Sequence, residues 1–243
     1  MLPFFRRIRR SLLDSGRLSK YLLYAIGEIL LVVLGILIAL QINNWNAAHK
    51  LKAEERAILE DLDKNLQSNV GILETFIKQQ QLREQEIQMI IEHIDLKLPM
   101  SDSLAANLRR VRMGENLALV TSAYESLKST GFDLISSKTL RLEIIQLFNY
   151  VYERNMKQIH EISQAQYRST HDVYVRSLKF ESESNGARVV PNHYPSFLDN
   201  QELYNLLTFR VAGKAGVIAM ARNILSETVR VKELFNQEFE KLQ

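Results

Sequence analysis

The sequence contains no cysteine, only four prolines and only nine glycines in 243 residues. The absence of cysteine excludes a disulfide scaffold, a thiol nucleophile and any cysteine-ligated zinc or iron–sulfur site. The scarcity of proline and glycine excludes collagen-like and proline-rich chains. Because 46% of the residues are hydrophobic and 24% are charged, the composition is that of a folded protein rather than a disordered one.

Catalytic motifs are also missing. The sequence has no glycine-rich nucleotide loop, no nucleophile elbow and no His-Glu-x-x-His motif. No histidine has a glutamate three positions before it, so the Glu-x-x-His pairs of di-iron helical bundles are absent. His160-Glu161 and His171-Asp172 give a weak metal signal on one predicted helix, and solvated helix positions explain them better. We therefore expect a non-enzymatic protein with no cofactor and no metal.

Positive charge is concentrated at the N-terminus. The formal net charge of +3 divides into +4 for residues 1–42 and −1 for residues 43–243. Nucleic-acid binding requires a concentrated basic face, so the neutral body argues against DNA or RNA as a partner. Residues 1–20 carry Arg6, Arg7, Arg9 and Arg10 around an apolar face. This segment is either a basic amphipathic helix on an anionic inner leaflet or simply a charged flank.

One long apolar run follows. Sixteen of the 22 residues from Tyr21 to Ile42 are Leu, Ile, Val or Ala, and Glu28 is the only formal charge among them. As a helix the run is about 33 Å long, and a bilayer core is roughly 30 Å thick. A cleaved signal peptide has a shorter apolar region and a small-x-small cleavage site, which Asn43–Asn46 does not offer. The run predicts one uncleaved transmembrane helix, or signal anchor, over residues 21–42 in a lipid bilayer.

The flanking charges predict the orientation of this helix. More basic charge precedes the run than follows it, so the positive-inside rule leaves residues 1–20 in the cytoplasm and exports residues 43–243. Trp45 then lies at the outer membrane–water interface, where amphipathic aromatic rings are favoured.

Glu28 is the one ionisable residue inside the predicted span, and such a residue is a candidate functional residue by default. On a helix it shares a face with Tyr24, Val32, Gly35 and Ala39. Gly35 and Ala39 form a small-xxx-small step that lets a second helix approach closely. The stripe therefore favours contact with a second copy of the chain or with a partner membrane protein. Two alternatives stay open: Glu28 snorkels to the interface or bonds the Tyr24 hydroxyl, or it carries an ion or proton.

Residues 43–243 consist of long proline-free stretches with apolar residues at helical spacing and no sustained strand alternation. Three long helices are predicted: one from the span to Leu98 that bends at Gly71, one from the Ser136-Ser137 caps to Phe180, and one from Asp199 to the end. Short helices are predicted over 103–113 and 120–130. A loop is predicted over 181–196. Gly131 is expected to close the second short helix. Small residues over Ala212–Ala221 indicate close helix approach there.

The predicted fold class is therefore all-α. One N-terminal transmembrane helix precedes an elongated antiparallel helical bundle with coiled-coil-like packing. The predicted division is a basic cytoplasmic segment over residues 1–20, the span over 21–42 and an exported bundle over 43–243.

Two stretches of the chain resemble a bacterial family known only as a domain of unknown function. The N-terminal stretch is Lys20-Tyr21-Leu22-Leu23-Tyr24-Ala25-Ile26-Gly27-Glu28-Ile29, continuing with Gly35-Ile36-Leu37-Ile38-Ala39-Leu40-Gln41-Ile42-Asn43-Asn44-Trp45-Asn46. The second stretch is Ser122-Ala123-Tyr124-Glu125-Ser126-Leu127-Lys128. The resemblance implies a single-span helical protein of the bacterial inner membrane with a periplasmic domain. It implies no activity, cofactor, ligand or site residue.

Three functions fit these features. The favoured one is a membrane-anchored, non-enzymatic interaction or scaffold protein that exposes its bundle to the periplasm. The second is a sensor or signal-relay subunit whose bundle binds a ligand. The third is an ion-coupled subunit of a stator-like complex that uses Glu28, an expectation based on architectural analogy alone.

Overall fold

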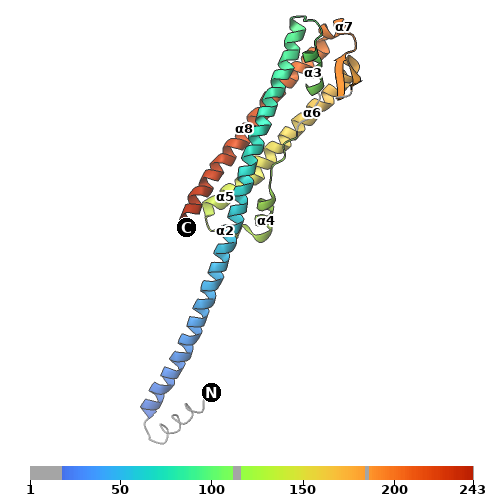
Figure 1. Ribbon diagram of the computed structural model, residues 1–243. Helices are drawn as coiled ribbons and strands as arrows, with labels where there is room; N and C mark the ends of the chain where they lie inside the picture. Colours follow the sequence, from blue (N-terminus) through green and yellow to red (C-terminus); the bar gives the residue numbers. More distant parts are fainter. Residues whose placement is uncertain (1–17, 112–115, 184–185, 243) are drawn as a thin grey trace. The chain divides into compact units, whose positions relative to one another are not determined.

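The computed structural model describes residues 18–111, 116–183 and 186–242 (Figure 1). The chain divides into two compact units, Met1–Arg56 and Ala57–Gln243, which are described separately below. Arg6, Arg7, Arg9 and Arg10, which the sequence assigns to the membrane surface, lie outside the described residues. Helix α2 spans Leu18–Asp95, and its N-terminal part, up to Arg56, is the described part of the first unit.

The second unit is almost entirely helical. After α2 its elements follow in this order: α3 (Asp102–Val111), α4 (Ser122–Thr130), the short turn η1 (Phe132–Leu134), α5 (Lys138–Gln146), the π-helical segment η2 (Leu147–Tyr152), α6 (Glu153–Ser177), β1 (Leu178–Glu183), β2 (Gly186–Pro191), α7 (Tyr194–Leu198) and α8 (Gln201–Leu242). The three predicted long helices and the two short ones are present. Helix α2 continues through Gly71.

Several helix ends follow from local chemistry. Gly131 ends α4 with a positive φ of 114°, which side chains rarely adopt, and its N–H donates to the carbonyl of Leu127 at 2.8 Å. The Ser137 hydroxyl caps α5 by accepting from the N–H of Leu140 at 3.4 Å. Helix α2 ends because Lys97 turns to a φ of 48° ahead of Pro99. The predicted roles of Gly131 and Ser137 are confirmed.

The predicted loop over residues 181–196 is wrong. Strands β1 and β2 form an antiparallel hairpin in which Phe180 pairs with Val189, and the short helix α7 follows. The preceding helix accordingly ends at Ser177 rather than at Phe180. An Asn-Gly pair is a hairpin signal in a sequence when a run of alternating apolar and polar residues lies on one side of it and β-branched residues lie on the other. Each strand is only six residues long, so the alternation is too short to stand out from the helical pattern around it.

The antiparallel prediction holds for two of the three pairs of long helices. Lys97 at the end of α2 pairs with Asp199 before α8 at 3.2 Å, and Lys232 near the end of α8 pairs with Asp63 of α2 at 2.9 Å. Helix α8 therefore runs antiparallel to α2. Helix α6 also runs antiparallel to α8, and so α2 and α6 run in the same direction (Figure 1). A parallel pair is possible because α3 and the segment to α4 carry the chain back.

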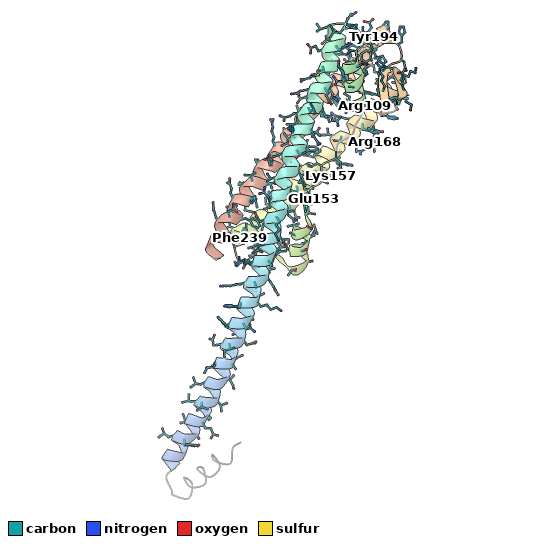
Figure 2. The ribbon with its side chains drawn as sticks, in the orientation of Figure 1. Arg109, Glu153, Lys157, Arg168, Tyr194 and Phe239 are labelled. Atoms are coloured by element: carbon teal, nitrogen blue, oxygen red, sulfur yellow. The ribbon has the colours of Figure 1, made fainter. Side chains whose placement is uncertain are left out.

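The interior of the second unit consists of two apolar clusters. Core A lies where α4, α5 and η2 pack on α2 and α8, and core B lies where α3, the hairpin and α7 pack on α2, α6 and α8. The fully buried members of core A include Leu62, Leu66, Leu127, Ile144, Tyr152, Ile224 and Phe235. Those of core B include Ile90, Leu108, Leu203 and Leu207. Figure 2 shows Phe239 near the core A end of α8 and Tyr194 at the opposite end of the unit.

Close helix approach in the small-residue segment of α8 is confirmed at Gly213 and not at Gly216. A Cβ added at Gly213 would lie 1.6 Å from Nε2 of Gln166 on α6, whereas nothing lies within 4 Å of one added at Gly216. Gly216→Ala is therefore expected to raise stability by about 0.5–1 kcal/mol, because glycine is costly in a helix interior.

Gly213→Ala is the matched control. It gains the same helix propensity but displaces the Gln166 amide, so its net effect should be clearly less favourable. Thermal unfolding of the fragment 47–243, followed by circular dichroism, measures both. A melting temperature that rises equally in the two variants would contradict the close approach.

Candidate functional site

The N-terminal part of α2 exposes a continuous apolar surface. All 14 Leu, Ile and Val side chains from Leu22 to Ile42 are between 44% and 73% exposed. They lie on every side of the helix, whereas a helix on the surface of a soluble domain is apolar on one side only. Among the described residues, α2 is the helix whose length and composition suffice to cross a membrane.

The predicted contact stripe lies on this exposed part of α2. Val32, Gly35 and Ala39 are exposed, and nothing lies within 4 Å of a Cβ added at Gly35. Tyr24 and Glu28 are half-buried. The Tyr24 hydroxyl makes no hydrogen bond with the described residues, which removes the proposed bond between it and Glu28. The small-xxx-small step is therefore open to another helix.

Trp45, the predicted interface residue, is 64% exposed and lies against His49, with 4.4 Å between the ring centroids. The contact joins two amphipathic rings one helical turn apart. Such rings are favoured at the level of lipid headgroups, and the interface role of Trp45 stays a prediction.

Two asparagines of α2 hold the segment that leads into α4. Oδ1 of Asn69 accepts the N–H of Val120 at 2.7 Å, and its Nδ2 donates to the carbonyl of the same residue at 2.9 Å. One turn earlier, Oδ1 of Asn65 accepts the N–H of Ala123 at 3.1 Å and the hydroxyl of Ser122 at 3.2 Å. Asn65 thus supplies the cap that the α4 terminus lacks within its own segment.

Asn69 also begins a hydrogen-bond chain through core A. Thr228 of α8 donates to the carbonyl of Ile224 at 2.7 Å, so the Tyr152 hydroxyl, 2.9 Å away, must donate to Thr228. The same hydroxyl accepts from Nδ2 of Asn69 at 3.4 Å. Asn69, Tyr152 and Thr228 are all fully buried. The chain links α2, η2 and α8, and burial raises the pKa of Tyr152.

The Ser122–Lys128 motif is a packing element. The Tyr124 ring stacks on Phe148 with a centroid distance of 4.4 Å, and its hydroxyl donates to Asn149 at 2.9 Å. Both partners belong to η2, a type of segment that frequently marks a functional position. Tyr124 and Leu127 are buried in core A, and burial raises the pKa of Tyr124. Packing therefore explains the three buried residues of this motif, Ala123, Tyr124 and Leu127.

A buried polar layer separates core A from core B. Lys214 of α8 donates to Oε1 of Gln80 on α2 at 3.1 Å. Arg210, one turn away, donates to the hydroxyl of Thr170 on α6 at 3.1 Å and to the carbonyl of Val111 at 2.8 Å. The side chains of Gln80, Thr170, Arg210 and Lys214 are each at most 5% exposed. The two buried cations fix how the three long helices align. If one helix slid along another, the cations would lose these hydrogen-bond partners.

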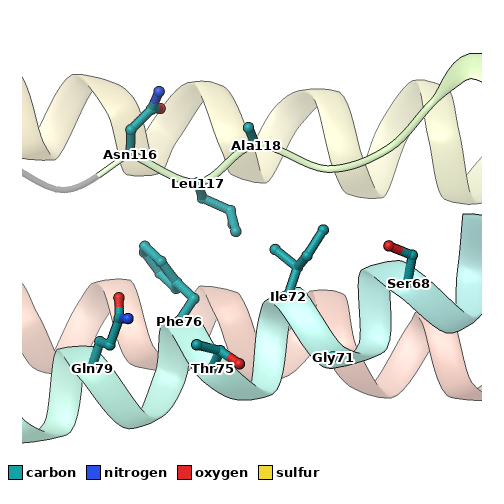
Figure 3. A pocket seen from close by; sticks show the side chains of 9 residues that line it. All are labelled: Ser68, Gly71, Ile72, Thr75, Phe76, Gln79, Asn116, Leu117 and Ala118. Atoms are coloured by element: carbon teal, nitrogen blue, oxygen red, sulfur yellow. The ribbon is translucent and has the colours of Figure 1, made fainter.

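An open groove lies between α2 and residues 116–118. It has a volume of about 540 Å³ and is lined by Ser68, Gly71, Ile72, Thr75, Phe76, Gln79, Asn116, Leu117 and Ala118 (Figure 3). Gly71 leaves the floor of the groove without a side chain, and Phe76 and Leu117 point into it from opposite sides. None of the described residues that line the groove is charged, so these residues offer shape rather than charge to a ligand.

The histidines considered as a weak metal signal are exposed. His160, Glu161, His171 and Asp172 all face solvent on α6, and His171 lies 5.6 Å from the ring of Tyr167. These positions agree with the interpretation as solvated helix residues.

These features define a class: a helical protein that joins an uncovered apolar helix to a bundle with two apolar cores. The profile of DUF6090, described as a family of unknown function, matches residues 28–182, and the chain belongs to this family. No curated protein and no solved structure matches the chain. The matched range contains Glu28, both asparagines and the α4 motif, whereas α8 lies beyond it.

Sequence reasoning missed the polar layer and the two asparagines. A signal for the layer exists, because Gln80 stands three residues after Ile77 and seven before Ile87, on the apolar stripe of α2. Lys214 likewise lies between Leu207 and Ile218 at core spacing. A polar residue at a core position predicts a buried hydrogen-bonded group. Its partners on the other helices are not visible in the sequence.

Proposed function

We propose that the protein is a membrane-anchored, non-enzymatic interaction or scaffold protein of the bacterial inner membrane. The N-terminus lies in the cytoplasm, α2 crosses the membrane near residues 21–42, and the bundle is exposed to the periplasm. The uncovered apolar surface from Leu22 to Ile42 supports this most strongly. Leaving such a surface in water is unfavourable by about 25 cal/mol per Å², whereas a lipid bilayer accommodates it.

The interaction itself is assigned to the stripe of Tyr24, Glu28, Val32, Gly35 and Ala39. A membrane helix gains no hydrophobic energy by leaving lipid for another helix, so contacts depend on close packing and on polar groups. The stripe offers both, since Gly35 is open to approach and Glu28 supplies a carboxyl group. The partner is a second copy of the chain or another membrane protein with a matching helix.

Substitutions in the stripe are expected to weaken association in a graded order. Glu28→Leu removes the polar contact and should raise the dissociation constant about fivefold, since interhelical hydrogen bonds in membranes contribute about 1 kcal/mol. Glu28→Gln keeps some hydrogen bonding and should have a smaller effect. Gly35→Leu blocks close approach and should weaken association independently. Mass measurement of the full chain purified in mild detergent, with identification of co-purifying proteins, gives the result.

Val33→Leu is the matched control, because it adds bulk on the opposite face of the same helix and should leave association unchanged. A parent chain that is monomeric and free of partners would contradict the proposal. Equal association in the parent, Glu28→Leu and Gly35→Leu would remove the case for the stripe. If Glu28→Gln impaired the cellular role of the protein as severely as Glu28→Leu while association stayed intact, ion or proton coupling would be favoured instead.

A further inference from the structure

The outer side of α8 between Leu203 and Ala221 carries no charge. Arg210 and Lys214 are the only charged residues of this stretch. Both point inward to the polar layer, with exposed fractions of 5% and 3%. The middle of the solvent-facing side is formed by five exposed residues, here called the neutral face: Asn205, Phe209, Ala212, Gly216 and Ala219.

The neutral face has the composition of an interface rather than of a solvated helix surface. The solvent-facing side of a helix normally carries charged and polar residues. Helix α6 of the same unit follows this rule, with exposed charged residues that include Glu153, Lys157 and Arg168 (Figure 2). The core of a protein–protein interface is instead depleted of charged residues and enriched in aromatic ones. Phe209 supplies an aromatic ring that is 58% exposed.

The spacing of the neutral face fits one further helix. Its five residues follow one another at steps of four and three, which is the spacing of a seam between two helices. Nothing lies within 4 Å of a Cβ added at Gly216, and alanines lie one turn away on either side of it along the seam. A second helix axis can therefore approach to about 8 Å, the lower end of the range for packed helices.

We propose that the neutral face binds the neutral face of a second copy of the chain, with the two α8 helices side by side and parallel. In a parallel pair related by two-fold symmetry each seam residue lies beside its own copy. Any charge on the seam would then meet a like charge, which is strongly unfavourable. A seam without charge meets this condition, and an identical copy is the partner that imposes it.

Asn205 adds a polar contact at one end of the seam. Its Oδ1 atom accepts a hydrogen bond from Nε2 of Gln201 at 2.8 Å and has a second lone pair. In the parallel pair Asn205 lies beside Asn205 of the second copy, and a side-chain amide can donate and accept at once. An asparagine on the seam of two helices favours one register and one oligomeric state.

The parallel orientation and the size of the face both point to copies held in one membrane, so this step rests on the proposed anchor. The Ala57 ends of the two second units then lie at the same end of the pair, as two chains anchored in one bilayer require. The face is about 21 Å long and 10 Å wide, much smaller than the roughly 800 Å² per partner of a stable soluble complex. Tethering raises the local concentration enough for such a weak contact to form, whereas the fragment 47–243 is expected to stay monomeric.

Cysteine cross-linking of the full chain in membranes tests the pair, because the chain contains no cysteine of its own. Mild oxidation should convert at least half of the Ala212→Cys variant and of the Ala219→Cys variant into disulfide-linked dimers, since Cα atoms across a parallel seam lie within the roughly 4–7 Å that a disulfide spans. Ala165→Cys, at an exposed alanine of α6, is the matched control and should give less than a tenth of that yield. Dimers from only one of the two α8 variants would overturn the parallel pair.

A second pair of variants separates the seam from random collision. Ala212→Glu, added to Ala219→Cys, places like charges side by side at an exposed position and should lower the dimer yield at least fivefold. Ala165→Glu, added to the same cysteine variant, should leave it unchanged. Equal yields in these two variants, or no α8 dimer at all, would overturn the proposal. If mass measurement nevertheless finds the chain associated, the contact through the membrane stripe stands without the neutral face.

Discussion

Replacing Leu31 and Leu34 together with arginine is expected to abolish membrane insertion. Each leucine lies near the centre of the apolar run and contributes about −0.5 kcal/mol to insertion, whereas a central arginine costs about 2.5–3.5 kcal/mol. The combined change of about 6–8 kcal/mol matches or exceeds the total of about −6 kcal/mol that the 14 Leu, Ile and Val residues provide. The variant should leave the membrane fraction completely.

A reporter enzyme that is active only outside the cytoplasm makes the same experiment report orientation. The parent should show activity with the reporter after Gln243 and none with the reporter before Met1, and the double arginine variant should lose the C-terminal signal. Leu82→Arg with Met89→Arg is the matched control, because both side chains are on α2, 55% and 56% exposed, but outside the apolar run. Export that survives Leu31→Arg with Leu34→Arg, or a reversed reporter pattern, would contradict the proposed topology.

Sequence patterns predicted most of the helices because their causes are local. Apolar spacing, Pro99, Gly131 and the Ser137 cap act within a few residues of the ends that they determine. The hairpin was missed because the two strands are short, and its buried residues Leu178 and Val189 depend on contacts with α3 and other parts of core B. Strand formation there is decided by tertiary burial more than by local pattern.

The arrangement of the helices could be predicted only in part. Antiparallel packing is the expectation for consecutive helices joined by short connections, and it holds where α6 is followed by the hairpin and α8. Between α2 and α6 the chain returns once along the unit, and Asn65 and Asn69 hold the returning segment by its backbone. Hydrogen bonds from a side chain to a distant backbone leave no periodic trace in the sequence.

The candidate stripe on α2 was a prediction from periodicity, and helical geometry alone places its residues on one face. The contact between His93 and Tyr194, in contrast, joins residues 101 positions apart, and only the fold brings them together. His193 lies two residues before Pro195 in a region predicted as a loop, so no sequence pattern marks it as the residue that caps α7 by accepting from the N–H of Ser196. Its role became visible with α7 itself.

Asn69→Ala is expected to be the most destabilising single polar substitution in core A. It leaves the N–H and C=O of Val120 without their partner, takes one donor from the Tyr152 hydroxyl and opens a small cavity beneath a fully buried position. A buried group that loses its hydrogen bond costs about 1–3 kcal/mol. We expect a loss of about 3 kcal/mol, which lowers the melting temperature of the fragment 47–243 by about 10 °C.

Asn65→Ala provides the comparison within the same helix and the same docked segment. Asn65 is half-buried, and water can replace its bonds to Ser122 and Ala123, so the loss should be about 1 kcal/mol, as for a helix cap. Tyr152→Phe tests the hydrogen-bond chain itself. Combined with Asn69→Ala it should cost at least 0.5 kcal/mol less than the sum of the single effects, because neighbours in one network are coupled. Equal losses for the two asparagines, or strict additivity of Asn69 and Tyr152 in denaturant unfolding, would show that the buried chain does not hold α2, η2 and α8 together.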